Sequence, residues 1–317
     1  MRTYLDFEKS IADLEGKIAE LRALASDDDS VSIEDEVHRL ETKAAEALRE
    51  VYDGLTPWQK TQVARHPQRP HFSDFAAMLF EDFTPLAGDR RFAEDHAIVG
   101  GPARFRGRSV MVLGHEKGST TEARLKHNFG MARPEGYRKA ARLMETADRF
   151  GLPILSLVDT AGAYPGIGAE QRGQSEAIAR CTQTCLSVKV PFLSVVIGEG
   201  GSGGAVALAS ANKVLMLEHA IYTVASPEAS ASILWRDSSR AKDAANNMKI
   251  TAQDLLRFGV IDTIVPEPVG GAHREPVQTV YETGNAIDSA LQEMEDMDGD
   301  AVVETRRQKF LEIGRHL

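Results

Sequence analysis

Two glycine-rich segments have the composition of anion-binding sites, and each follows an apolar stretch that reads as a strand. The first, at 159–168, is Asp-Thr-Ala-Gly-Ala-Tyr-Pro-Gly-Ile-Gly, and the second, at 198–205, is Gly-Glu-Gly-Gly-Ser-Gly-Gly-Ala. Such small side chains let a ligand approach the main chain closely. The second segment also opens into a predicted helix, whose first N–H groups lack partners within the helix and favour negative charge. We therefore predict stabilisation of an oxyanion or enolate by backbone N–H groups.

Two other motifs overlap the second segment. Residues 198–203 fit the dinucleotide-binding pattern G-x-G-x-x-G, and Glu218 lies at a plausible distance to hold a ribose, as in an NAD-dependent dehydrogenase. Against this alternative, the following helix is short, and the first glycine segment would have no role in such a site.

Residues 200–204 also fit the pattern G-x-S-x-G of hydrolases, with Ser202 as the nucleophile. Asp262 and His273 follow it in hydrolase order. Against this alternative, two residues separate the predicted strand from the motif, whereas a nucleophile elbow follows its strand at once. A non-catalytic scaffold is a third possibility, but it would leave the paired glycine segments unexplained.

A repeating pattern of strand, glycine segment and helix positions both segments. Pro153 and Pro191 lie 38 residues apart (191 − 153), each beside an apolar strand that ends in glycines. Apolar strands that alternate with helices predict an α/β fold with a sheet covered by helices, in which ligands bind where strands give way to helix N-termini. The ranges that read as strands are 109–114, 154–158, 190–197, 214–217, 221–224 and 260–265. The ranges that read as helices are 135–150, 170–187, 203–211 and 251–258.

Helical patterns flank this core on both sides. Apolar stripes over 5–24 and 33–51, separated by a charged turn at 26–30, predict an antiparallel helical hairpin. Its own core is too small to be stable alone, so it must pack against the rest of the chain or a partner. We predict an N-terminal helical region at 1–85, a core at 86–270 and a C-terminal helical extension at 271–317.

Composition excludes several classes of protein. The 317 residues carry a formal net charge of −10, which disfavours duplex nucleic acid as a partner. A local excess of Lys and Arg at 122–142, which includes Arg133, Arg138 and Lys139, could meet an anionic ligand such as the phosphates of coenzyme A. Cys181 and Cys185 read as core residues of one helix and cannot alone form a zinc site. No apolar run approaches the roughly 20 residues that span a bilayer, and the first residues are charged, so we expect a cytoplasmic protein.

The glycine segments and several other stretches together resemble one family. One of these other stretches is Glu-Gln-Arg-Gly-Gln-Ser-Glu-Ala-Ile-Ala at 170–179. Further matching stretches lie at 64–70, 86–90, 128–131, 134–140, 231–235 and 265–274. From about residue 4 to 275 the sequence resembles the alpha-subunit family of the acetyl-CoA carboxylase carboxyltransferases. The family usually has proline at the position of Ala161, which puts the stiffness of the first segment in doubt.

The resemblance implies a crotonase-like (ClpP/crotonase) core of repeated ββα units. It also implies a heterotetramer of two alpha and two beta subunits, in which the beta subunit supplies a zinc ribbon and much of the acetyl-CoA site, so that no metal is expected in this chain. Biotin arrives on a separate biotin carboxyl carrier protein, and ATP is used by a separate biotin carboxylase. No P-loop pattern occurs in the sequence, in keeping with that division.

The family's reaction transfers a carboxyl group from carboxybiotin to acetyl-CoA and gives malonyl-CoA for fatty acid synthesis. In that reaction carboxybiotin loses carbon dioxide, biotin takes a proton from the acetyl methyl group, and the resulting enolate attacks the carbon dioxide. Both anions bear charge on a carbonyl oxygen, so two oxyanion holes are the minimum machinery and no protein general base is required. We predict that the N–H groups of Gly203 and Gly204 form one hole and those of Gly166 and Ile167 the other; which pair faces biotin stays open. The residues predicted to contact substrate or shape its pocket are Tyr164, Glu199, Gly200, Gly201, Ser202, Arg133, Arg138 and Lys139.

Overall fold

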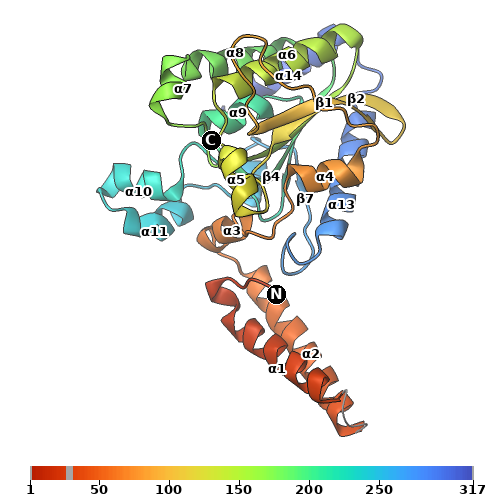
Figure 1. Ribbon diagram of the computed structural model, residues 1–317, viewed down its shortest axis with the longest axis vertical. Coiled ribbons are helices and arrows are strands. Elements are labelled where there is room, and N and C mark those ends of the chain that lie inside the picture. Colours follow the sequence, from red (N-terminus) through yellow and green to blue (C-terminus); the bar gives the residue numbers. More distant parts are fainter. Residues whose placement is uncertain (1, 26–30, 316–317) are drawn as a thin grey trace.

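The computed structural model describes residues 2–25 and 31–315 and has one central sheet (Figure 1). The predicted charged turn at 26–30 lies outside the described residues. The strand order is β1-β2-β3-β4-β5-β7, and β6 pairs with β4. The strands are β1 (Ile98–Phe105), β2 (Arg108–His115), β3 (Ile154–Thr160), β4 (Phe192–Gly201), β5 (Lys213–Leu217), β6 (Ile221–Thr223) and β7 (Thr263–Val265).

The strand pairing explains the repeat in the sequence. Ile154 of β3 lies opposite Phe192 of β4, an offset of 38 residues (192 − 154) that equals the spacing of the two prolines. The two repeats therefore lie side by side in parallel, so their glycine segments emerge at the same edge. Every residue of β3 and β4 is buried, as a sheet covered on both faces requires.

Strand β1 was not predicted, because its Gly-Gly-Pro sequence at 100–102 reads as a turn. The structure shows why a strand contains these residues. A Cβ atom at Gly101 would lie 1.9 Å from the carbonyl oxygen of Thr84, so the segment at 84–86 can run against β1 only where there is no side chain. β1 pairs antiparallel with β2 along its whole length.

Helices cover the sheet and extend beyond it. In the described residues, α6, α8 and α9 pack together and contact β1 to β4, whereas α13 packs on β4, β5 and β7. The helix predicted at 170–187 is divided into α7 and α8, because Gly173 between them has a left-handed φ of 81°. The α-helices are α1 (Lys9–Ala25), α2 (Val31–Asp53), α3 (Pro57–Ala64), α4 (Phe72–Leu79), α5 (Thr121–Lys126), α6 (Pro134–Phe150), α7 (Ile167–Gln171), α8 (Gln174–Ser187), α9 (Ser202–Ala209), α10 (Pro227–Trp235), α11 (Ala241–Asn247), α12 (Ala252–Arg257), α13 (Pro276–Gln292) and α14 (Gly299–Glu312).

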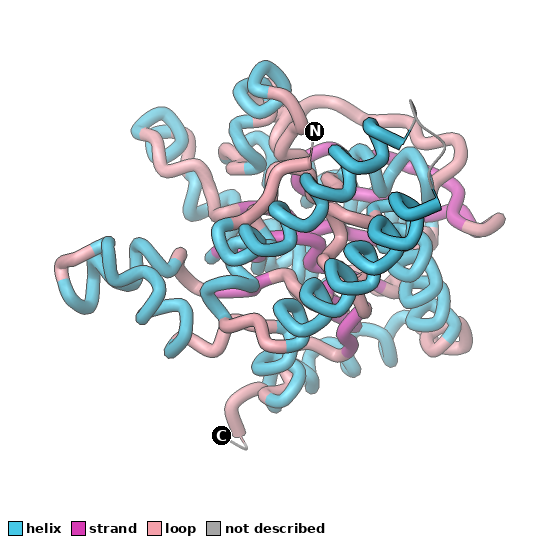
Figure 2. The backbone as a smooth tube through the Cα atoms, turned by 90° about the horizontal axis from the view of Figure 1, so that it is seen from below, coloured by secondary structure: helices cyan, strands magenta, loops and turns pink. Residues whose placement is uncertain are grey.

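Helices α1 and α2 form the predicted antiparallel hairpin, which extends away from the body of the protein (Figure 1). Seen from below, the two helices lie side by side in front of the body (Figure 2). Buried polar contacts anchor its base. Arg274 contacts Glu15 at 2.8 Å and Glu8 at 3.2 Å, and the Tyr52 hydroxyl donates to Glu8 at 3.1 Å. The hairpin is thus tied to the segment that precedes α13, because a buried carboxylate such as Glu8 needs these partners. No helix among residues 2–25 and 31–315 has both the length and the apolar character needed to cross a membrane.

Two histidines stack beside this anchor. The ring centroids of His66 and His273 are 3.8 Å apart, and His66 Nε2 donates to the carbonyl oxygen of Thr3 at 3.0 Å. Burial lowers the pKa of both imidazoles. For His273, repulsion by His66 when that ring is protonated, and by Arg69 and Arg274, lowers the pKa further, to about 3. Both rings are therefore neutral at neutral pH, and protonating both would place two like charges in contact.

Acid is expected to weaken the stack. A histidine whose pKa is lower in the folded than in the unfolded state, where it is about 6.5, contributes stability that is complete above that value and is lost as the pH falls towards the folded pKa. We expect the urea midpoint to fall between about pH 7.5 and about pH 5, and to fall less in His273→Phe. His38→Phe, a matched change at an exposed position of α2, should leave the pH dependence unchanged. An equal drop in all three proteins would contradict this role for His273.

Candidate functional site

The second glycine segment is mostly strand rather than loop, which corrects the prediction. β4 continues through Gly201, and residues 199–201 pair with β6, so that α9 begins directly at Ser202. Glycine is needed there because the chains approach closely. A Cβ atom at Gly201 would lie 2.2 Å from the carbonyl oxygen of Ala161, and one at Gly200 would lie 2.8 Å from the Tyr222 ring. Gly200 and Gly201 are buried, so they shape the junction from within the sheet.

Ser202 is the exposed corner between β4 and α9, with a left-handed φ of 52°. The motif around it therefore follows its strand at once, and the objection drawn from two intervening residues was wrong. The other two residues of a triad are nevertheless engaged elsewhere. Asp262 accepts from the backbone N–H of Val214 at 2.7 Å and pairs with Lys309, while His273 stacks on His66. Asp262 and His273 are therefore not arranged as a triad with Ser202.

Glu218, which the dehydrogenase alternative requires as a ribose ligand, is also occupied. Its carboxylate accepts from the backbone N–H of Glu267 at 3.1 Å, next to the segment that anchors the hairpin.

The first glycine segment turns sharply after β3. The Thr160 hydroxyl accepts from the N–H of Gly162 at 3.1 Å and donates to the carbonyl of the same residue at 2.8 Å. The backbone N–H of Tyr164 donates to Ala132 at 2.9 Å, and α7 then starts after Gly166. Thr160 thus closes the turn locally and holds it at the end of the strand.

The two glycine segments touch each other. A Cβ atom at Gly204 would lie 2.9 Å from both the N atom of Ala163 and the C atom of Gly162, and 3.0 Å from the Tyr137 hydroxyl. Gly203 beside it is less crowded, since a Cβ atom there would first meet Ile178 at 3.4 Å. Segments about 40 residues apart in the sequence therefore meet at the entrance of α9.

The predicted N–H donors lie at two helix starts. Gly203 and Gly204 are in the first turn of α9, while Gly166 caps α7 and Ile167 is its first residue. In the described part of the chain, no side chain and no carbonyl outside their own helix or strand accepts from these four N–H groups. First-turn N–H groups have no partner inside a helix, so they are available to an anion.

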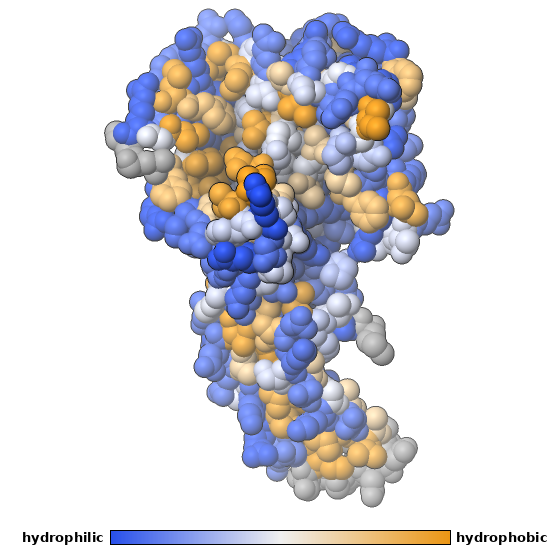
Figure 3. All heavy atoms as spheres, turned by 90° about the vertical axis from the view of Figure 1, so that its left-hand side faces the viewer, coloured by the Kyte–Doolittle hydropathy of each residue, from blue (hydrophilic) through white to orange (hydrophobic). Residues whose placement is uncertain are grey.

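A groove of about 460 Å³ adjoins Ser202 and Gly203, and its walls are mostly apolar. It lies where the strand β6 and the segment before α12 border α9. Figure 3 looks onto the side of the protein from which α10 and α11 project, with the helical hairpin extending below the body. Other residues that line the groove are Val206, Tyr222, Thr223, Val224, Met248, Lys249, Ile250, Leu255 and Val260.

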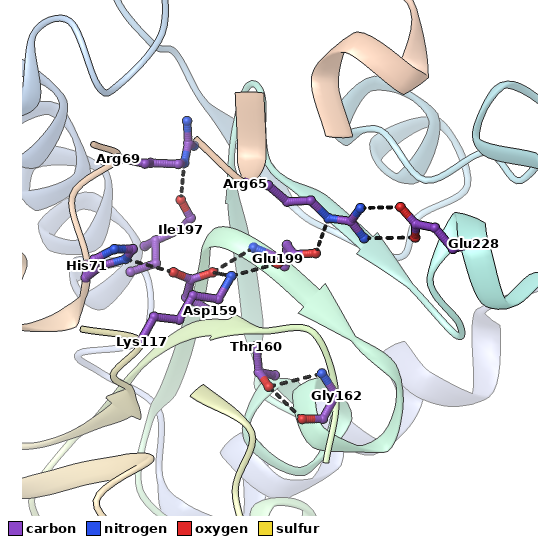
Figure 4. Close-up of polar contacts among 10 residues, drawn as sticks. All are labelled: Arg65, Arg69, His71, Lys117, Asp159, Thr160, Gly162, Ile197, Glu199 and Glu228. Atoms are coloured by element: carbon purple, nitrogen blue, oxygen red, sulfur yellow. Dashed lines mark hydrogen bonds and ion pairs between the residues drawn. The ribbon is translucent and has the colours of Figure 1, made fainter. Parts of the chain in front are cut away.

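A chain of ion pairs also links the two glycine segments through their acidic residues Asp159 and Glu199 (Figure 4). Lys117 Nζ lies 2.7 Å from Asp159 Oδ1 and 2.7 Å from Glu199 Oε2. Arg65 Nε lies 2.6 Å from Glu199 Oε1, and its Nη1 lies 2.6 Å from Glu228 on α10. The side chain of Asp159 is 4% exposed and that of Glu199 10%, so these charges depend on one another rather than on water.

The surrounding charges set the ionisation of this cluster. Burial alone would raise the pKa of Asp159, but Lys117 and then His71 lower it well below its usual range. Burial would likewise raise the pKa of Glu199, and Lys117 and Arg65 lower it. Burial opposes the charge of Lys117, yet Asp159 and Glu199 raise its pKa above the usual value. Lys117, Asp159 and Glu199 are therefore all charged at neutral pH.

The predicted basic patch is not one surface, which is a second correction. Lys139 is 2% exposed; its ammonium pairs with Glu94 and donates to the carbonyl of Asp95 at 2.8 Å. Arg138 is half-buried and donates to the carbonyl of Arg172. Both cations lie on the inward side of α6 and hold neighbouring segments, so they are not free to bind a phosphate.

Arg133 is exposed and lies near the first glycine segment. Its guanidinium stacks on the Tyr164 ring at 4.8 Å from the centroid. The ring in turn covers Gly166, where a Cβ atom would lie 2.2 Å from Tyr164 Cε1. Arg133, Tyr164 and Gly166 are thus brought together, and Ile167 next to them is 75% exposed.

Lys117, Arg65 and His71 were not predicted as site residues. Lys117 stands in Gly-His-Glu-Lys-Gly-Ser-Thr at 114–120, which lacks the spacing of a P-loop, and Arg65 lies in one of the stretches that resemble the family. A single cation between a strand and a glycine is the only local signal. In the described residues, no group of three or more His, Cys, Asp or Glu side chains is arranged to hold a metal ion.

Comparison with known proteins gives one consistent family. Residues 4–314 match the family described as acetyl co-enzyme A carboxylase carboxyltransferase-like. A Xanthobacter autotrophicus protein named acetyl-coenzyme A carboxylase carboxyl transferase subunit alpha is 70% identical over 317 residues, which cover 100% of both chains. The protein of the same name from Rhizobium johnstonii is 65% identical over 317 residues, again 100% of both chains.

Solved structures share the fold at low sequence identity. Transcarboxylase 12S, with methylmalonyl-coenzyme A and methylmalonic acid bound, has a TM-score of 0.58 and 20% identity over 71% of this chain and 41% of its own. A chain of the Pseudomonas malonate decarboxylase hetero-tetramer in complex with coenzyme A has a TM-score of 0.56 and 16% identity over 68% of this chain and 86% of its own. The expected crotonase-like α/β fold is thereby confirmed.

Proposed function

The chain belongs to the family of acetyl-coenzyme A carboxylase carboxyltransferase alpha subunits, and from that premise we propose that its paired glycine segments are the alpha-subunit half of the transferase site. The observation that carries this proposal is the contact between the segments at Gly204, which places free N–H groups of α9 beside the turn at 161–163. The dehydrogenase and hydrolase alternatives find no support in the family or in the contacts of Glu218 and Ser202.

The site's residues suit substrates that carry a carbonyl oxygen and a flat apolar part. Gly203 lines the groove, where an added Cβ atom would first meet Ile178 at 3.4 Å, and the groove itself is mostly apolar. Carboxybiotin, delivered on a separate biotin carboxyl carrier protein, supplies the carboxyl group when bound. Acetyl-CoA is the acceptor, and its carboxylation gives malonyl-CoA for fatty acid synthesis.

The N–H groups of Gly203 and Gly204 act as hydrogen-bond donors to a carbonyl oxygen that gains negative charge. The bond between the carboxyl carbon and the biotin nitrogen breaks, that nitrogen takes the proton from the acetyl methyl group, and the methyl carbon forms its new bond to the carboxyl carbon. Charge develops meanwhile on the thioester oxygen, and fixed donors would stabilise it. Gly166 and Ile167 are the second donor pair, with Tyr164 and Arg133 at their side. Glu199 orients the α9 entrance through its ion pairs.

Because the proposed site is only one half of a transferase site, we propose that a second subunit supplies the other half. A beta subunit with a zinc ribbon pairs with this chain in an α2β2 heterotetramer, and biotin carboxylase completes the system with its own ATP site. We place this assembly in the cytoplasm.

Carboxyl transfer should require both subunits. We expect the isolated chain to form no malonyl-CoA from acetyl-CoA and carboxybiotinyl carrier protein, and to form it after addition of a carboxyltransferase beta subunit from a related bacterium. The measurement is product formation over time, with beta subunit alone as the control. Transfer by the isolated chain would contradict the divided site, and no transfer by the mixture would contradict the proposed function.

A further inference from the structure

Lys117 is the contact between the buried acids of the two glycine segments. Its ammonium lies 2.7 Å from Asp159 at the end of β3 and 2.7 Å from Glu199, three residues before α9. We infer that Lys117 is a positioning residue for carboxyl transfer, which fixes the offset between the two segments by neutralising both carboxylates at once. The inference rests on the proposed function and identifies a residue on which that site depends.

The backbone pairing of β3 with β4 is interrupted between Val158 and Thr160, so backbone hydrogen bonds alone do not fix the register of the two glycine segments. Val158 lies opposite Val196, an offset of 38 residues (196 − 158), whereas Thr160 lies opposite Gly200, an offset of 40 (200 − 160). At the shift, Asp159 Oδ1 accepts from the backbone N–H of Glu199 at 2.9 Å. A side-chain carboxylate thus takes the place of a backbone acceptor in the pairing of β3 with β4.

Glycines lie around Lys117 and Asp159 at positions where any larger residue would collide with these two side chains. A Cβ atom at Gly198 would lie 2.5 Å from Asp159 Oδ1. One at Gly130, whose φ is 75°, would lie 2.9 Å from Lys117 Cγ and 2.7 Å from the carbonyl oxygen of Asp159. Gly118, next to Lys117, has a φ of 83° and donates to Glu116 at 2.6 Å.

Removing the ammonium would leave two buried carboxylates without enough positive charge. The other titratable or charged groups that face the cluster from the packed elements are His71, which lies 3.3 Å from Asp159 Oδ2, Arg65, which lies 2.6 Å from Glu199 and also pairs with Glu228, and the buried His115. Neighbouring carboxylates in this situation take up a shared proton, so the pKa of the pair rises. A proton would then substitute for the ammonium at low pH, and the two acids would repel each other at high pH.

The test uses the full chain in complex with a beta subunit. Lys117→Met is expected to lower kcat by about 10- to 100-fold at neutral pH with little change in KM, because the donors are displaced while the apolar groove is intact. Its kcat should rise as the pH falls from about 8 to about 6, whereas that of the unmodified complex should not rise. Lys117→Arg, which keeps the charge, should recover part of the activity and lose the pH dependence.

Two further variants separate positioning from general loss of stability. Lys309→Met removes a similarly buried lysine, which lies on α14 and pairs with Asp262, and it should leave kcat and its pH dependence unchanged. The double variant Lys117→Met with Glu199→Gln removes one of the two charges and should regain activity over Lys117→Met alone. If Lys117→Met does not assemble, the arginine and double variants decide: recovery in either supports the inference, and recovery in neither overturns it.

Amide hydrogen exchange provides a readout that does not depend on turnover. In Lys117→Met, the amides of 160–166 and 199–205 should exchange faster than in the unmodified chain, while those of the hairpin should not. Unchanged kcat, pH dependence and exchange in Lys117→Met would overturn the inference. Absence of transfer by the unmodified complex would instead contradict the proposed function, and the exchange data would still test the role of Lys117.

Discussion

Replacing Gly204 by valine is expected to abolish carboxyl transfer in the assembled complex, with a fall in kcat of at least about 10²- to 10³-fold, the range seen when one oxyanion-hole donor is lost. A Cβ atom at Gly204 would already lie 2.9 Å from the backbone of the first segment, at Gly162 and Ala163, and a branched side chain cannot fit. The substitution must therefore separate the two segments and move the N–H groups at the start of α9.

Matched glycine variants make this prediction specific. Gly203→Ala should cost much less, because the new methyl group would meet Ile178 at 3.4 Å, close to an ordinary contact. Gly16→Val on the hairpin has nothing within 4 Å of the added Cβ and should leave kcat unchanged. The measurements are kcat and KM, with circular dichroism to confirm that each variant is folded. Near-normal turnover by Gly204→Val would contradict the role given to this contact.

Loss of the Arg306 side chain is expected to lower the free energy of unfolding more than any other substitution proposed here. Arg306 is buried on α14, and no carboxylate within residues 2–25 and 31–315 forms an ion pair with it. Its guanidinium donates to the carbonyls of Cys185, Val188 and Val190 and to Asn212 Oδ1 at 2.6–3.0 Å. Burial lowers its pKa to about 10, so it remains a cation at neutral pH. These bonds hold α14 against the C-terminal end of α8 and the segments that precede β4 and β5.

Arg306→Ala is expected to lower the free energy of unfolding by about 3–5 kcal/mol, the cost of breaking a buried charged network, because several acceptors lose their donor and a cavity remains. That is a large part of the roughly 5–15 kcal/mol that stabilises a typical domain. Urea unfolding measures the change. Arg307→Ala, at the exposed neighbouring position, is the matched control and should change stability by less than about 0.5 kcal/mol. Similar midpoints for the two variants would show that α14 does not depend on Arg306.

Local pattern was sufficient for much of the fold. The 38-residue repeat became the register of β3 against β4, the apolar stripes became the α1–α2 hairpin, and Gly151 ends α6 in a left-handed conformation. These features depend on burial period and on backbone preference, which a sequence displays directly. The predicted boundaries between three regions at 85 and 270 remain a prediction.

Two predictions from the sequence were wrong, the conformation of residues 198–201 and the basic surface at 122–142. Both depend on contacts between segments that are distant in the sequence. Residues 198–201 read as a loop because glycine disfavours strands, but pairing with β6 and close approach to Ala161 override that preference. The basic run at 122–142 reads as one surface, yet helical geometry turns Lys139 inwards onto Glu94.

The sequence by itself determined the family, the alternation of strands and helices, and the location of the two glycine segments at strand ends. Only the tertiary structure decided that these segments touch at Gly204 and that Lys117 joins Asp159 to Glu199, which lies 82 residues (199 − 117) after Lys117 in the sequence. The physical reason is that backbone preference and burial act over a few neighbouring residues, whereas the pairing of buried charges depends on the register between strands and on which side chains the packing brings within hydrogen-bond distance.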